Sequence, residues 1–252
     1  MRVKVFALIT LGLLACSPPS SSRSVFPPAL VNTAPGTVAD DVAHEIIERG
    51  RAYETATGDF SSVISTQVRD LTRGQTFESR GGLAVHRPDA MRMQMSAAGG
   101  VTAIDLLARD GGYYLRLAGR DWVRGRLDET RSNGFPAASL ARSFLGIDWS
   151  QARAVVATAA VAVVRAPTSE GYALVTLDRR DGTEREVRWF DARDAERARI
   201  RFGEYDTDEA GLRWPRVVLF WQADPAVTAT ITVETRTPRP TLPPATFQPP
   251  SS

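Results

Sequence analysis

Apolar and polar side chains alternate with a period of two along much of the sequence after Phe60. Met91, Met93 and Met95, for example, are separated by single polar residues. Because successive side chains of a strand point to opposite faces of a sheet, this period predicts strands with one buried face and one exposed face. Half-buried strands of this kind are typical of antiparallel sheets.

Turn sequences separate the alternating runs. Asp110-Gly111-Gly112 and Asp181-Gly182 can take positive φ angles between two strands. The run 155–164, rich in Ala and Val, fits a helix or a strand, and its β-branched residues favour a strand. We predict about ten strands in all. The later ones are expected over residues 171–179, 185–193, 197–205, 212–222 and 227–236. So long a meander is expected to curl into one curved sheet.

Two segments carry a helical period instead. The first follows Thr37, a candidate N-cap, and places Val42, Ile46 and Tyr53 on one face. The second interrupts the meander: Pro136 can start a short helix and Gly146 can end it. This insert carries Leu140, Phe144 and Leu145. Both helices need an apolar surface to cover, and the sheet supplies one.

The first sixteen residues, MRVKVFALITLGLLAC, read as an export signal with two cations followed by an apolar run. The run is shorter than the ~20 residues that cross a bilayer as a helix. Leu13-Leu14-Ala15-Cys16 resembles the lipobox of bacterial lipoproteins, in which the cysteine is lipidated after cleavage. The alternative is an ordinary signal peptide. We expect residues 1–15 to be removed and Cys16 to become the membrane anchor.

The ends of the expected mature chain are rich in proline. Residues 16–37 predict an extended tether, and residues 237–252 predict a tail without fixed structure in which Phe247 is the only aromatic residue. No linker of this composition divides residues 60–236. A single domain is therefore expected over residues 38–236, between the two ends.

Charge and cysteine content exclude several classes of function. The formal net charge is +2, and Arg2 and Lys4 of the signal account for all of it. A neutral mature chain gives no basic surface for nucleic acid. One cysteine forms neither an internal disulfide nor a cysteine-based zinc site.

The sequence also lacks the motifs of common enzymes and cofactor sites. It has no Gly-x-Ser-x-Gly elbow, no phosphate-binding loop and no His-x-x-x-His pair. His44 and His86 are expected to be exposed or satisfied locally. We therefore expect a protein that is not an enzyme and needs no cofactor or metal, although carboxylates brought together by the fold could still form a hydrolase site.

The segments GGLAVHRPDAMRMQM (81–95) and IDLLARDGGYYLRLAG (104–119) resemble the bacterial lipoprotein-localisation proteins LolA and LolB and their wider superfamily. The shared pattern is a strand ending in Arg-Pro, a strand of large apolar residues, and a strand with an Asp-Gly turn leading into aromatic residues. The order of the helix, the helical insert and a Phe-x-Pro-Pro chain end also agrees. The resemblance covers most of residues 38–250.

This resemblance implies a mainly β (α+β) fold: a curved antiparallel sheet forming an incomplete barrel covered by an N-terminal helix and a short helical insert. It also implies a cavity that shields acyl chains from water. Arg87 matches the arginine that hydrogen-bonds to the helical lid of the carriers; the alternative is an exposed arginine at a strand end. The candidate cavity-lining residues, for which ordinary core packing is the alternative, are Met91, Met93, Met95, Tyr113, Leu115, Leu117, Leu140 and Phe144.

Two functions follow as expectations. The first is a lipid-anchored envelope protein, on the periplasmic face of the outer membrane, that binds acyl chains or lipoproteins as carrier or acceptor. The second is a structural or docking lipoprotein that uses the same fold with a filled core and binds envelope protein partners.

Overall fold

The protein is described by a computed structural model that covers residues 29–31, 36–128, 136–224 and 226–249. Thirteen strands form one antiparallel sheet in the order β6-β5-β4-β3-β2-β1-β13-β12-β11-β10-β9-β8-β7. Consecutive strands lie side by side except β6 and β7, and β1 also pairs with β13, so the sheet is a meander whose first and last strands are joined. The expected mainly β, antiparallel fold is confirmed.

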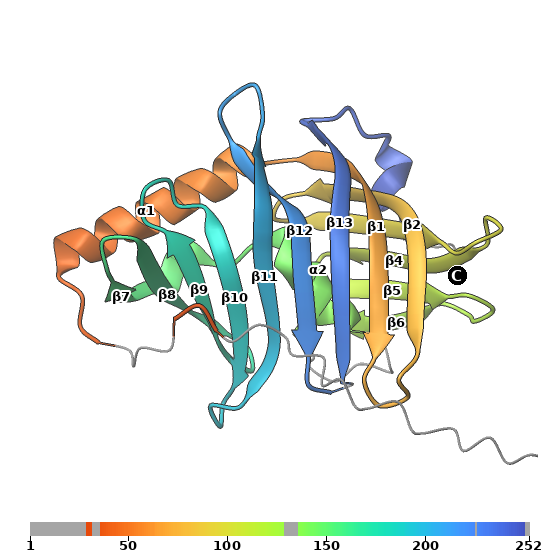
Figure 1. The fold of residues 1–252 in the computed structure, drawn as a ribbon, viewed down its shortest axis with the longest axis horizontal. Coiled ribbons are helices and arrows are strands. Elements are labelled where there is room, and N and C mark those ends of the chain that lie inside the picture. Colours follow the sequence, from red (N-terminus) through yellow and green to blue (C-terminus); the bar gives the residue numbers. More distant parts are fainter. Residues whose placement is uncertain (1–28, 32–35, 129–135, 225, 250–252) are drawn as a thin grey trace, which may run out of the picture.

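The sheet curves without closing, as Figure 1 shows. Its two edges are β6 and β7, which follow each other in the chain. The helical insert lies in the connection between these edges, and so the opening of the incomplete barrel is the place where the insert enters. The strands are β1 (Phe60–Asp70), β2 (Thr76–His86), β3 (Ala90–Ser96), β4 (Thr102–Arg109), β5 (Gly112–Leu117), β6 (Val123–Arg126), β7 (Arg153–Ala157), β8 (Val161–Thr168), β9 (Gly171–Asp178), β10 (Glu184–Asp191), β11 (Glu196–Thr207), β12 (Arg213–Gln222) and β13 (Val227–Pro238).

The run 155–164 is extended, as expected, but it contains two strands. Thr158 makes the turn between β7 and β8: its Oγ1 accepts from the backbone N–H of Val161 at 3.0 Å and donates to the carbonyl of the same residue at 2.9 Å. Threonine stabilises turns by such local side-chain bonds. This turn and the short edge strand β6 raise the strand count above the expected ten. The Asp110-Gly111 turn is confirmed, with φ angles of 51° and 72°.

Helix α1 (Asp40–Thr57) lies across the ends of β7 to β10 (Figure 1). Arg49 Nη1 donates to the carbonyl oxygens of Arg179 and Arg180, in the turn between β9 and β10, at 2.6 and 3.2 Å. The buried face of α1 consists of Ile46, Gly50, Tyr53 and Thr57. The expectation that Thr37 caps this helix is wrong: the N-cap is Ala39, and no side chain bonds the first turn.

Helix α2 (Ala137–Leu145) lies inside the curve of the sheet, behind β12 in the view of Figure 1. It begins after Pro136 and ends before Gly146, which has a φ of 95°. Eight of its nine residues are buried, because the concave face of the sheet surrounds the helix. Apolar side chains from α2 and from the inward-facing positions of β1 to β5 and β8 to β13 form one continuous core.

The expectation that the C-terminal segment lacks fixed structure is wrong as far as residue 249. After β13 the chain crosses to the outer face of the sheet and forms a short 3₁₀ helix, η2 (Pro244–Phe247). Arg92 Nη1 donates to the carbonyl of Thr246 at 3.1 Å, and Arg109 Nη1 donates to that of Phe247 at 2.9 Å. Arginines on β3 and β4 thus hold a proline-rich backbone that has few hydrogen bonds of its own.

The described parts of the expected tether also contact the domain. The N–H of Leu30 donates to Oε1 of Glu186 at 3.2 Å, and the N–H of Gly36 donates to the carbonyl of Val155 at 2.8 Å. No helix in the described part of the chain is long and apolar enough to cross a membrane. Cys16 and the rest of the expected tether lie outside the described residues.

Candidate functional site

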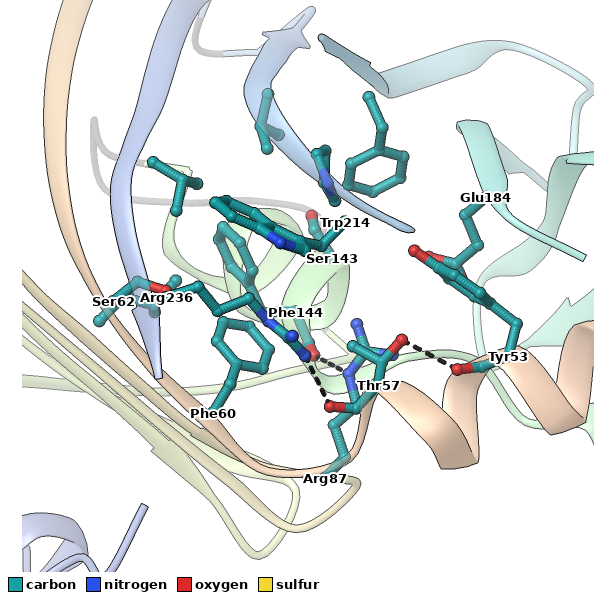
Figure 2. A pocket seen from close by; sticks show the side chains of 15 residues that line it. Tyr53, Thr57, Phe60, Ser62, Arg87, Ser143, Phe144, Glu184, Trp214 and Arg236 are labelled. Atoms are coloured by element: carbon teal, nitrogen blue, oxygen red, sulfur yellow. Dashed lines mark hydrogen bonds between the residues drawn. The ribbon is translucent and has the colours of Figure 1, made fainter. Parts of the chain in front are cut away.

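A small, mostly apolar cavity lies where α1, α2 and the sheet meet (Figure 2). Its volume is about 50 Å³, well below the roughly 300–1,000 Å³ of ligand pockets. In this conformation the site is closed. Its lining residues are Tyr53, Thr57, Phe60, Ser62, Leu83, Arg87, Ser143, Phe144, Glu184, Phe202, Trp214, Pro215, Val218, Val233 and Arg236.

Arg87 joins the sheet to α2 at this cavity. It follows β2, at a cis peptide bond to Pro88, and its Nε donates to the carbonyl of Phe144 at 2.8 Å. Phe144 is in the last turn of α2, where carbonyl groups have no partner within the helix. The guanidinium therefore satisfies an orphan carbonyl and interacts favourably with the negative end of the helix.

Arg236 makes the corresponding contact with α1. Its Nη2 donates to the carbonyl of Thr57, the last residue of that helix, at 2.9 Å (Figure 2). Its Nη1 lies 3.4 Å from Oδ2 of Asp208, and its guanidinium lies 5.2 Å from the ring centroid of Phe60. Two arginines of the sheet thus hold the C-terminal ends of both helices at one cavity.

Acidic groups at the cavity interact with Arg87. Glu184 on β10 is buried, and desolvation raises its pKa to about 7, against the opposing effect of Arg87. Desolvation likewise raises the pKa of Glu54 on α1, again opposed by Arg87. Burial raises the pKa of Tyr53 to about 12, and its hydroxyl donates to the carbonyl of Arg213 at 2.9 Å. The polar groups at the cavity are therefore strongly desolvated.

Glu54 also connects the two helices. It accepts hydrogen bonds from the indole N–H of Trp149 and from the backbone N–H of Ile147, just after α2. The approach is so close that a Cβ on Gly146 would lie 1.6 Å from Glu54 Oε1. Helix α2 is thus held at its C-terminal end by α1 on one side and by Arg87 on the other.

The structure brings two of the expected site residues to the cavity, Arg87 and Phe144. The other candidates are not among its lining residues. Met91, Met93 and Met95 are buried on the inner face of β3, where they belong to the continuous core. Tyr113, Leu115 and Leu140 are buried in the same core, and Leu117 packs against it from the end of β5.

Several residues of the cavity have no signal in the sequence. Glu184, Trp214 and Arg236 are far from each other and from Arg87 along the chain, and their strands are not adjacent to β2. Of the lining residues that were not expected at a site, Tyr53 has a signal in the sequence, because the helical period places it on the apolar face of the first helix. His44 is exposed, and His86 pairs with Asp59, Nδ1 to Oδ2, at 2.7 Å. No metal-binding cluster of acidic, His or Cys residues occurs in the described ranges.

Comparison with known proteins gives matches by structure. No protein-family model matches the sequence, and no curated protein matches it. A solved domain from Vibrio parahaemolyticus, whose description is an outer membrane lipoprotein-sorting protein domain, superposes with a TM-score of 0.62 at 14% identity, covering 82% of this chain and 96% of that one.

Two other solved structures agree with this match. A LolA superfamily protein from Nitrosomonas europaea superposes with a TM-score of 0.60 at 8% identity, covering 82% of this chain and 97% of that one. A DUF1329 family protein from Desulfovibrio piger gives 0.53 at 8% identity with the same coverages. The architecture that the sequence resemblance implied is confirmed: the chain has a LolA/LolB-like fold, an open antiparallel half-barrel with helices at its concave face.

Proposed function

We propose that this chain is a lipid-anchored envelope protein that binds acyl chains, free or attached to lipoproteins, between the half-barrel and its two helices. The observation that supports this most is the cavity at the junction of α1, α2 and the sheet. The wall of the cavity is mostly apolar, and helix α2, which Arg87 holds through the carbonyl of Phe144, closes it. The LolA-like fold supports the same function. No step of it requires a bond to be broken, so we propose a non-enzymatic role.

The closed cavity must enlarge before an acyl chain enters. Helix α2 is the element that can move, because it is a short insert between two edge strands and is not hydrogen-bonded into the sheet. Displacing it would open the core beneath, including Met91, Met93 and Met95 on β3. Each acyl methylene sheltered there contributes about 0.8 kcal/mol, and flexible methionine side chains adapt to tails of different shape.

Lipidation at Cys16 is proposed from the sequence. Several acyl chains on one residue hold a protein stably at a membrane, whereas one chain is marginal. With Ser17 after the cysteine, we propose that the anchor lies in the outer membrane with the domain on its periplasmic face. The role is then that of an acceptor or carrier of lipoproteins. Changing Cys16→Ser should abolish incorporation of labelled fatty acid; continued incorporation would contradict the anchor.

The binding function is tested by what the protein carries. The chain is purified without detergent, and native mass spectrometry then looks for bound lipid or lipoprotein. We expect an acyl-bearing adduct and saturable uptake of a fluorescent acyl probe. No adduct together with no uptake would overturn the proposal.

A second function is favoured by a specific observation. Met91, Met93 and Met95 are at most 2% exposed and pack into the continuous core, as in a protein whose half-barrel is filled. Such a protein would bind envelope partners through its surface. It would take up no acyl probe, so the same uptake measurement separates the two functions.

A further inference from the structure

Two polar atoms on the cavity wall are buried without a hydrogen-bond partner among the described residues. They are Nη1 of Arg87 and Oγ of Ser62 on β1. Buried donors are almost always satisfied in proteins, because leaving one unpaired costs free energy. Other polar groups of this wall have partners: Arg87 Nε bonds Phe144, Arg236 bonds Thr57 and Asp208, and Tyr53 bonds Arg213.

Two acidic side chains already share the guanidinium of Arg87, so its free N–H is matched better by a neutral acceptor than by an anion. Glu184 and Glu54 both interact electrostatically with this guanidinium. An added carboxylate or phosphate would compete with them for it and would raise the pKa of both further. A neutral carbonyl oxygen accepts from Nη1 without that cost.

The apolar part of the wall defines the rest of the ligand. Phe60, Leu83, Phe202, Val218 and Val233 line the same cavity with hydrocarbon. A ligand that satisfies both features has a carbonyl next to a long apolar chain. Ester- and amide-linked acyl groups have this structure, whereas ether-linked alkyl chains lack the carbonyl.

We infer that the cavity recognises the carbonyl group at the head of an ester- or amide-linked acyl chain, with Arg87 Nη1 as its hydrogen-bond donor. The inference rests on the proposed function and adds to it a choice between acyl and alkyl chains. Arg87 then has two tasks at two different atoms: Nε holds α2, and Nη1 binds the ligand.

The test compares two neutral ligands that differ in the carbonyl. The mature chain without its cysteine, residues 17–252, is exported behind a cleavable signal that adds no lipid. 1-Palmitoylglycerol and its ether counterpart 1-hexadecylglycerol then compete with a fluorescent acyl probe. We expect the ester to bind about tenfold more tightly, the factor of one hydrogen bond to a charged donor. Equal affinities would overturn the inference.

A variant assigns the donor. Arg87→Leu should bring the ester-to-ether ratio close to one. The ratio is used because any loosening of α2 changes both affinities alike. As a control, Arg109→Leu on the outer face should leave the ratio unchanged. A ratio that survives Arg87→Leu would contradict the assignment.

Two further outcomes are informative. Palmitate binding more tightly than the ester would overturn the choice of a neutral acceptor. Absence of probe binding in the unaltered chain would overturn the proposed function, and the inference with it. Probe binding with no discrimination between ester and ether would overturn the inference alone.

Discussion

Glu184 is the residue whose surroundings differ most from those of an ordinary carboxyl group. It is buried on β10 at the cavity, and desolvation raises its pKa from 4.5 to about 7. Between these values the folded state binds more protons than the unfolded state. Its contribution to stability is therefore largest below about pH 4.5 and is lost as the pH rises to about 7.

Glu184→Gln removes this titration while keeping the shape of the side chain. We expect the free energy of unfolding of the unaltered chain to fall by on the order of 3 kcal/mol across that range from this group. The variant should show a clearly flatter profile in urea unfolding at several pH values. Some slope will remain, because the pKa of Glu54 is raised in the same direction. A Glu209→Gln control at an exposed site should keep the full slope; identical slopes in both variants would contradict the assignment.

Gly146 is required by both its backbone and its neighbour. Its φ of 95° is strained for other residues, and an added Cβ would lie 1.6 Å from Glu54 Oε1. We expect Gly146→Ala to lower the free energy of unfolding by about 2 kcal/mol or more. Gly203→Ala is the control, because nothing lies within 4 Å of its added Cβ. Equal losses in both variants would show that the junction between α1 and α2 tolerates a side chain.

At the scale of elements, α2 is the part of the molecule on which the proposed function depends. Its place in the connection between the edge strands β6 and β7 puts it over the concave face. The bond from Arg87 to Phe144 holds its C-terminal end. The proposal that α2 is a lid predicts that weakening this bond speeds the exchange of a bound acyl chain.

Arg87→Leu should therefore increase the release rate of a fluorescent acyl probe, by about tenfold for the loss of a hydrogen bond from a charged donor. Stopped-flow displacement measures that rate. Arg109→Leu is a matched control: it also removes an arginine that donates to a backbone carbonyl, but at η2 on the outer face. An unchanged release rate in Arg87→Leu would contradict the lid.

The C-terminal segment is an element that contributes stability. Leu107 on β4 is outside the continuous core, on the opposite face from Leu106, yet it is only 1% exposed. Residues 240–249 lie on this side of the sheet, held by Arg92 and Arg109. Deleting residues 240–252 should lower the free energy of unfolding by about 2–4 kcal/mol, because two hydrogen bonds of arginine and the cover of the outer face are lost. An unchanged midpoint of thermal unfolding would show that the segment contributes no stability.

For the whole molecule, local patterns predict the kind of sheet but not its closure. The alternation of Met91, Met93 and Met95 identifies a strand, because the side-chain period is a property of neighbouring residues. The pairing of β1 with β13 joins the two ends of the meander, and no local pattern contains it. The same pairing brings Phe60 and Arg236 to one cavity. The proline-rich composition of the C-terminal segment predicts a tail without fixed structure. That prediction is wrong because arginines on β3 and β4 donate hydrogen bonds to the backbone carbonyls of the segment.

The candidate site likewise contains residues that a local motif predicts and residues that only the whole fold brings together. Arg87 and Phe144 are predictable through the family resemblance, since each belongs to a short motif. Glu184 and Trp214 enter the cavity from β10 and β12 and are determined by the curvature of the whole sheet. The inner-face stripe of β3 was identified correctly as buried, but a period of two does not distinguish a packed core from the wall of a cavity.

The central claim, that acyl chains enter beneath α2, is tested most directly by the fluorescence of Trp214. This tryptophan lines the cavity, whereas Trp221 alternates with buried Phe220 and faces the other side of β12. A brominated acyl chain, which quenches tryptophan on contact, is titrated into the mature chain and into Trp214→Phe and Trp221→Phe. Entry of the chain beneath α2 predicts saturable quenching in the unaltered chain and in Trp221→Phe, and weaker quenching in Trp214→Phe, in which Trp149 and Trp189 of the same core remain. No quenching, or equal quenching without Trp214, would contradict it.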